Sequence, residues 1–465
     1  MIWWAVVLYA LGIAVAFLLL AWTCLLYVPF RWRPVGLYLF VPKWAAGAFT
    51  PFIAAAGLLL ALVGGLRDWW WMAVPAAFAT VGAVIVIVRL GLVRADLAAA
   101  LGPDWAERIP TQRHARMVGR WWRGRLPTVP EPRLRQDVAF ATVPGTGRNL
   151  LCDVWQPPED VPASGLAVVY LHGSAWCMLD KDLGTRPLFR HLAAQGHVVV
   201  DVAYRLFPET DMPGMVADAK RVVAWLTTHA ADLEVRPDRI VLAGGSAGGH
   251  LALLAGYAND DPVLTPAELA GSDPQVCAVV SLYGQADLAA HYDHTGQQKS
   301  CRPDDPQPDW DAPPPPRMAR LVGPNAGRLK LHMTAASRLD WLVGGTPSQM
   351  PDRYAQLSPV HHVHPGCPPT LLLHGEHDEM APVAAMRQLH RRLQQAGVPV
   401  TAVYLPQTDH AFDLLGTAWS PPARTAIHVL ERFLAVLAST DQRSAAQPIS
   451  GAHAERVALP QARSV

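Results

Sequence analysis

The sequence predicts an α/β protein, with a mostly parallel sheet flanked by helices, preceded by a three-helix transmembrane region. Two observations carry this prediction. Over residues 134–440, short apolar runs alternate with helix-like segments, as in a parallel sheet that helices cover on both faces. Residues 1–93 hold three long stretches without a charged side chain, in a chain that is 51% apolar and only 17% charged.

The charge-free stretches run over residues 1–30, 45–66 and 69–88, and each is long enough to cross a hydrocarbon core of roughly 30 Å as a helix. Pro51 and Pro75 fall near the expected helix starts, where a missing N–H costs little. A cleaved signal peptide is the alternative for the first stretch, but that stretch is too long and has no basic n-region. Tryptophans gather at the segment ends, which is typical of membrane interfaces.

Basic residues predict the orientation of these helices. The first loop carries Arg31, Arg33 and Lys43, the second only Arg67 beside Asp68, and a run of arginines follows the third stretch. The positive-inside rule then places the N-terminus outside and everything after the third span in the cytoplasm. We therefore expect a multi-pass integral membrane protein.

Residues 94–133 read as a basic juxtamembrane segment and linker. Their arginines and Trp105, Trp121 and Trp122 fit either a segment lying on an anionic leaflet or an ordinary solvated connector. The run LPTVPEPR at residues 126–133 is typical of a linker between domains.

The following domain should contain strands and helices in alternation. Residues 287–351 interrupt this pattern with a proline-rich run, so we expect an insert over the rim of the site or a disordered surface loop. Residues 441–465 are polar and should form a flexible tail. The expected strands are 165–173, 197–205, 239–246, 276–284, 369–378 and 399–406, and the expected helices are 215–229, 249–257, 381–396 and 425–438.

The run Gly244-Gly245-Ser246-Ala247-Gly248 follows a predicted strand and precedes a predicted helix. That context is typical of a nucleophile elbow, in which a sharp turn lifts a serine hydroxyl above the sheet and leaves no room for neighbouring side chains. A phosphate-binding loop is the alternative, but the run lacks the Gly-Lys-Ser/Thr ending. Ser246 is therefore the predicted nucleophile.

A serine nucleophile needs a base, and the base needs an orienting carboxylate. Asp378 follows a predicted strand and is the expected acid, with Glu376 as the second choice, and His410 follows the next strand as the expected base. An oxyanion requires aligned N–H donors, for which we predict Ala247 after the nucleophile, with Gly173 and Ser174 after an earlier strand. Ala175 is a less certain donor.

Seven motifs in order make the chain resemble the esterase/lipase branch of the α/β-hydrolase superfamily, namely the hormone-sensitive-lipase-like group and its BD-FAE relatives, over about residues 137–437. The resemblance implies an α/β-hydrolase fold, carboxylic ester hydrolysis without metal or organic cofactor, and a triad of Ser246, Asp378 and His410. One departure is Ser174, where such families usually have a second glycine, and its hydroxyl could add a donor. The motifs are HGSAW at His172, DVAYRLFPE at Asp201, DAKRVVAWL at Asp218, GGSAGGHLA at Gly244, GGTPSQMPDRYAQLSPV at Gly344, HGEHDEMAP at His374 and DHAF at Asp409.

The sequence as a whole predicts a membrane-anchored serine carboxylic-ester hydrolase, an esterase or lipase that works through an acyl-enzyme. Its expected partners are a small-molecule or lipid ester and the lipid bilayer, and the net charge of +1 gives no sign of nucleic acid binding. An acyltransferase with the same triad and a non-catalytic membrane scaffold are the alternatives. The six cysteines show no zinc spacing, and a Cys301–Cys367 bridge stays open.

Overall fold

The computed structural model describes residues 2–29, 33–143, 145–182, 184–259, 261–270, 276–295 and 339–439. Its centre is an eight-stranded sheet in the order β1-β2-β4-β3-β5-β6-β7-β8, in which β3 to β8 run parallel and the β1–β2 and β2–β4 pairs are antiparallel. The predicted α/β class is therefore confirmed. The strands are β1 Arg133–Thr142, β2 Asn149–Gln156, β3 Gly165–Leu171, β4 Val198–Ala203, β5 Val235–Gly245, β6 Ala278–Leu282, β7 Thr370–Gly375 and β8 Val400–Leu405.

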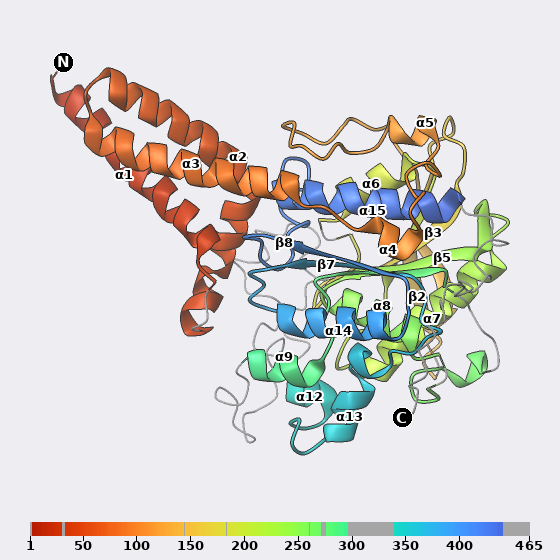
Figure 1. The fold of residues 1–465 in the computed structure, drawn as a ribbon. Coiled ribbons are helices and arrows are strands. Elements are labelled where there is room, and N and C mark those ends of the chain that lie inside the picture. The colour runs from red at the N-terminus through yellow and green to blue at the C-terminus, as the bar shows by residue number, and fades with distance from the viewer. Residues whose placement is uncertain are drawn as a thin grey trace, which may run out of the picture.

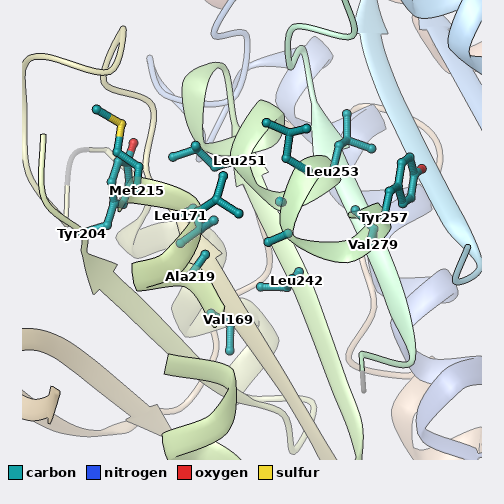
Figure 2. Packing of buried hydrophobic residues seen from close by; sticks show 14 of the residues in the cluster. Val169, Leu171, Tyr204, Met215, Ala219, Leu242, Leu251, Leu253, Tyr257 and Val279 are labelled. Carbon is teal, nitrogen blue, oxygen red and sulfur yellow. The ribbon is translucent and has the colours of Figure 1, made fainter. Parts of the chain in front are cut away.

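Helices cover both faces of the sheet (Figure 1). On one face α7 (Met212–Thr228), α8 (Ala247–Tyr257) and α14 (Val383–Gln395) share a core with the strands, and on the other α6 (Arg186–Ala193) and α15 (Pro421–Ser439) do. Figure 2 shows the first of these cores, where side chains of α7 and α8 pack on β3, β5 and β6. This packing fixes the end of β5, from which the Ser246 turn departs.

The predicted parallel strands and helices all occur. The elements that were not predicted include β1, β2 and α6. Strand β1 lies at the sheet edge with most of its side chains exposed or half-buried, so it lacks the continuous apolar run of a central strand. The turn glycines Gly145 and Gly147 between β1 and β2 were an available signal for a hairpin.

Three long helices, α1 (Ile2–Tyr27), α2 (Arg33–Leu66) and α3 (Trp70–Leu92), project from one corner of this domain (Figure 1). All three are long and apolar enough to cross a membrane. In the described part of the chain, the exposed large apolar side chains lie almost entirely on these helices, with Val28, Trp121 and Val263 as the exceptions. Such a large apolar surface is typical of a membrane-facing region.

Helix α2 differs from its predicted span. It begins at Arg33 rather than near residue 45, and it continues through Pro42 and Pro51, so the expectation that Pro51 marks a helix start was wrong. Pro75 likewise lies inside α3. The prediction began the span after Lys43 because that residue is charged, but Lys43 is buried against the loops that follow β7 and β8.

Residues after α3 form short helices α4 (Leu97–Leu101) and α5 (Thr111–His114) and then an irregular segment that packs on α15. Val118 N donates to Glu431 Oε2 at 2.8 Å, and the Trp122 indole N–H donates to the Trp419 carbonyl at 2.6 Å. These hydrogen bonds fasten the segment to the α/β domain, at α15 and at the residues that precede it.

Only the flanks of the predicted insert at 287–351 belong to the described residues, and they form α9 (Leu288–His294) and α12 (Leu339–Val343), with α13 (Pro351–Gln356) at its end. The Trp341 side chain packs with Cys177 and Met178 of the loop after β3. The proline-rich run, Cys301 and the predicted tail at 441–465 lie outside the described residues. Two short 3-10 helices complete the fold, η1 Ala267–Leu269 and η4 Pro359–His361.

Candidate active site

Ser246 occupies a sharp turn between β5 and α8. Its backbone has φ 53° and ψ −123°, a strained combination for a residue with a side chain. The surrounding glycines leave room for this turn: a Cβ on Gly248 would lie 1.9 Å from the Leu171 carbonyl oxygen, and one on Gly245 would lie 2.8 Å from the Tyr283 hydroxyl. Close packing of strand, turn and helix therefore requires glycine at these places.

The imidazole of His410 bridges Ser246 and Asp378. Its Nε2 lies 2.8 Å from Ser246 Oγ, and its Nδ1 lies 2.9 Å and 3.1 Å from the two carboxylate oxygens of Asp378. In this geometry the Nδ1–H donates to the carboxylate, which leaves the Nε2 lone pair to accept the serine proton. The structure thus brings the three predicted triad residues together.

The Asp378 carboxylate is buried and accepts two backbone N–H groups, from Met380 at 2.9 Å and Ala381 at 2.7 Å. Burial raises its pKa, but the charge and hydrogen bonds of its neighbours, His410 first, lower it further, so the net pKa lies below its usual range. The second choice, Glu376, instead lies 3.4 Å from Arg387 near the surface.

Two further groups lie beside the predicted triad, Tyr283 against the His410 ring and His374 against Asp378, and neither role was predicted from the sequence. Tyr283, which follows β6, sets its ring edge-on to the imidazole with 4.7 Å between centroids, and its hydroxyl donates to Asp413. His374, at the end of β7, lies 3.4 Å from Asp378 and 3.1 Å from the Ala381 carbonyl. Burial lowers the pKa of His374, which favours its neutral form. Tyr283 and Asp413 belong to different loops, so no spacing in the sequence indicates their contact, whereas His374 lies only four residues before Asp378.

The predicted oxyanion donors lie around Ser246. Ala247 is the first residue of α8. Gly173 packs against Ser246, because a Cβ added to Gly173 would lie 3.4 Å from Ser246 Cβ. The Ser174 hydroxyl, however, accepts from Trp176 N at 2.9 Å and contacts the Tyr204 hydroxyl at 2.7 Å.

The Tyr204 hydroxyl has a single hydrogen, which it donates to the His172 carbonyl at 2.7 Å. Ser174 Oγ must therefore be the donor in its hydrogen bond with the Tyr204 hydroxyl. The expectation of an added hydroxyl donor was therefore wrong, since that hydroxyl braces the loop instead. The brace matters because Ala175 and Trp176 both have positive φ, at 45° and 62°, which side chains disfavour.

His250 on α8 connects the predicted oxyanion loop, the residues from Gly173 to Trp176 after β3, to the far side of the site. Its Nδ1 accepts from the Trp176 indole at 3.1 Å, and its Nε2 donates to the Leu357 carbonyl at 2.8 Å. Burial lowers the pKa of His250 to about 4, so the ring is neutral at physiological pH and both nitrogens are satisfied. The loop, the elbow helix and the segment after α13 are thus joined by one side chain.

A cavity of about 330 Å³ lies beside the oxyanion loop. None of the triad residues lines it. Its wall mixes apolar side chains with both signs of charge, so it shows no single ligand chemistry. The lining includes Asp137, Arg148, Leu179, Lys181, Tyr204, Arg205, Phe207 and Glu209.

Two histidines that precede β7 have backbone carbonyls as partners. His362 Nε2 lies 2.6 Å from the Gln356 carbonyl, and His364 Nε2 lies 3.2 Å from the Tyr257 carbonyl. Among the described residues, no group of three or more His, Cys, Asp or Glu side chains is arranged to hold a metal ion. The described cysteines, Cys367 among them, are free thiols.

Comparisons with known proteins find relatives over most of the domain. The BD-FAE family model matches residues 152–308, and the prolyl oligopeptidase family model matches residues 327–439. The chain is 32% identical over 304 residues to the probable carboxylic ester hydrolase LipM of Mycobacterium tuberculosis, a match that covers 65% of this chain and 61% of LipM.

It is also 30% identical over 352 residues to the esterase LipQ of the same organism, covering 74% of each chain. The chain therefore spans about three fifths of LipM and three quarters of LipQ. Among solved structures, esterase 2 of Thermogutta terrifontis shares 23% identity with a TM-score of 0.47, over 65% of this chain and 94% of that one.

Proposed function

Because this chain belongs to the esterase/lipase family of the α/β-hydrolases, a family of serine carboxylic-ester hydrolases, we propose that it cleaves esters with Ser246 as nucleophile. The observation that carries the proposal is the unbroken chain of contacts from Ser246 Oγ through His410 to Asp378, at 2.8 Å and 2.9 Å. The names of LipM and LipQ, an ester hydrolase and an esterase, agree with this reaction.

In the first half of the reaction, His410 Nε2 takes the proton of Ser246 as Oγ attacks the acyl carbonyl. Asp378 accepts the Nδ1–H, so it holds the required tautomer and stabilises the imidazolium that forms. His410 then protonates the leaving alcohol, and the acyl group stays on Ser246. Water, activated by the same imidazole, attacks this acyl-enzyme and releases the acid.

The tetrahedral oxyanion would be held by the backbone N–H groups of Gly173, Ser174 and Ala247. Ala247 N is the first amide of α8, where the helix dipole adds positive potential. Because the Ser174 hydroxyl is engaged by Tyr204, only the backbone of Ser174 is offered to the substrate in this proposal.

The helices α1–α3 would anchor the enzyme in a bilayer as three spans, with the catalytic domain on the cytoplasmic side. The apolar surface of these helices and the arginines that follow α3 favour this arrangement. Arg67, at the exposed α2–α3 turn, would then face the outside. A cysteine placed there by Arg67→Cys should react with a membrane-impermeant maleimide added to intact cells. Labelling only after lysis would place this turn in the cytoplasm and so contradict the proposed orientation.

We propose a lipophilic or membrane-derived ester as the substrate, because anchoring would hold the site beside the bilayer. The test uses the full chain in vesicles, with p-nitrophenyl esters of rising acyl length and a lipid ester. A fluorophosphonate probe should label the wild type and not Ser246→Ala, and hydrolysis should be lost with the label.

Each competing function gives a different result in the same assays. Unlabelled wild-type protein without ester turnover would favour a scaffold. Ester products formed when an alcohol acceptor is added would favour acyl transfer. Turnover of short esters alone would support ester hydrolysis but contradict the proposal of a lipophilic substrate.

A further inference from the structure

A buried lysine of the second apolar helix reaches the loops that carry the triad. Lys43 is only 1% exposed, and its Nζ lies 3.1 Å from Asp409 Oδ2 and 3.7 Å from Glu379 Oε1. Nζ also donates to the His377 carbonyl at 3.4 Å. These partners adjoin the triad in the chain, since Asp409 precedes His410 and both His377 and Glu379 flank Asp378.

The carboxylate that Lys43 meets ties the two triad loops to each other. Asp409 Oδ1 accepts the backbone N–H of His410 at 2.7 Å and that of Glu379 at 3.0 Å. Its other oxygen, Oδ2, faces the Lys43 ammonium. Asp409 is 6% exposed, so its negative charge depends on this cation, because a buried carboxylate without a counter-charge is costly.

The next residue of α2 fastens the other side of His410. The Trp44 indole N–H donates to the Ala411 carbonyl at 2.8 Å, and Ala411 has a positive φ of 55°. Consecutive residues of α2 therefore hold the two residues that flank His410. Farther along the same loop, the Trp419 ring contacts Phe49 and Phe52 of α2, with centroids 6.0 Å and 6.1 Å apart.

We propose, on the basis of the serine hydrolase function above, that Lys43 and Trp44 are positioning residues of the active site. Through them α2 sets the place of the His410 loop, so the apolar helices form part of the catalytic apparatus as well as an anchor. The reason is geometric: the imidazole must meet Ser246 and Asp378 together, and a misplacement of about 1 Å can cost roughly 100-fold in rate.

The experiment compares variants of the full chain in detergent micelles. It measures kcat and KM for p-nitrophenyl butyrate, with active sites counted by complete fluorophosphonate titration. Lys43→Met, which removes the cation but keeps the length of the side chain, should lower kcat per site about 10- to 100-fold, while KM stays within about twofold. Lys43→Arg keeps the charge and should retain most of the wild-type kcat.

Two further variants separate positioning from folding. Lys43→Met with Asp409→Asn removes both charges and should recover about tenfold of the kcat lost in Lys43→Met alone, since no uncompensated carboxylate remains. Trp44→Phe keeps an aromatic ring but loses the N–H donor, and should lower kcat about three- to tenfold. The matched control is Arg67→Met, which removes an exposed cation at the opposite end of α2 and should leave kcat unchanged.

The outcomes distinguish this proposal from the function on which it rests. A wild-type chain without ester turnover overturns both. An active wild type with wild-type kcat per titrated site in Lys43→Met and Trp44→Phe overturns the positioning role alone. If Lys43→Met lowers the number of titrated sites and the melting temperature but not kcat per site, α2 contributes to stability only, and the positioning role is again overturned.

Discussion

Replacing Tyr204 by Phe tests whether the brace on the oxyanion loop serves catalysis. The hydroxyl of Tyr204 donates to the His172 carbonyl and accepts from Ser174 Oγ, both at 2.7 Å, and all three residues are buried. The Tyr204 ring also stacks on the His172 imidazole, with 4.5 Å between centroids. Phenylalanine keeps this stacking, so the change removes one oxygen atom and little else.

The magnitude follows from two buried hydrogen bonds, each worth about 1 kcal/mol net. If the resulting loss of about 2 kcal/mol falls entirely on the loop conformation that offers Gly173 and Ser174 N–H to the substrate, the competent population decreases at most about 30-fold. We expect kcat/KM to fall about 10- to 30-fold, less than the roughly 10²–10³-fold in kcat for outright removal of an oxyanion donor.

The assay is p-nitrophenyl butyrate hydrolysis by the full chain, with melting temperatures measured in parallel. Tyr257→Phe is the matched control, because Tyr257 is equally buried and loses a comparable hydrogen bond, 2.9 Å to Thr370 Oγ1, at the far end of α8. Tyr257→Phe removes one such hydrogen bond and Tyr204→Phe two, so the control should lose somewhat less stability, but only Tyr204→Phe should lose activity. Equal kcat/KM in the two variants would refute the reasoning.

Two further predictions concern the elbow and a buried acid. Gly245→Ala should lower kcat at least about tenfold, because the new Cβ would lie 2.8 Å from the Tyr283 hydroxyl and 3.1 Å from that of Tyr170, and an unchanged kcat would show that the turn adapts freely. Asp201→Asn should become more stable relative to wild type as pH rises. Burial raises the pKa of Asp201 well above its usual range, so the folded chain keeps a proton that the unfolded chain releases above about pH 4, and unfolding free energy falls with pH. A difference in melting temperature that does not vary between pH 5 and 8 would contradict this.

The parallel sheet and the sharp turn at Ser246 were predictable because their signals are local. Each of β3 to β8 is a short apolar run closed by glycine, proline or a polar residue, and Ser246 lies in the single context of strand, glycine turn and helix. Chain order then selected Asp378 and His410 from several candidates. Strand β1 was not predicted from the sequence, because at the exposed edge of the sheet it lacks the apolar pattern on which the prediction of strands depends.

The conformation of the oxyanion loop was not predictable from its own residues. Ser174 suggested an extra hydroxyl donor, because that is the chemistry of an isolated serine. Its actual role depends on Tyr204, thirty residues away in the chain, because the Tyr204 hydroxyl accepts the hydrogen bond of the Ser174 hydroxyl. The role of Tyr283 was hidden for the same reason, since it contacts His410 and Asp413 in another loop.

Lys43 shows most clearly why sequence reasoning stopped at the boundary between the apolar helices and the domain. A hydropathy scan treats a lysine as the end of a span, and an orientation rule counts it as a loop charge. Both interpretations assume that its partner is water, whereas its partners are Asp409 and Glu379 in the triad loops.

The packing around this boundary explains why a charge can be buried there. Leu26 of α1, Ile53 of α2 and Leu90 of α3 belong to the same buried cluster as Phe433 of α15 and the strand residues beneath it. A core shared by the helices and the domain makes a cation buried here costly unless it meets a carboxylate, and Asp409 of the domain supplies one. The contacts of Lys43 with Asp409 and of Trp44 with Ala411 let a helix outside the hydrolase fold act on the His410 loop, because a shift of α2 would move both partners.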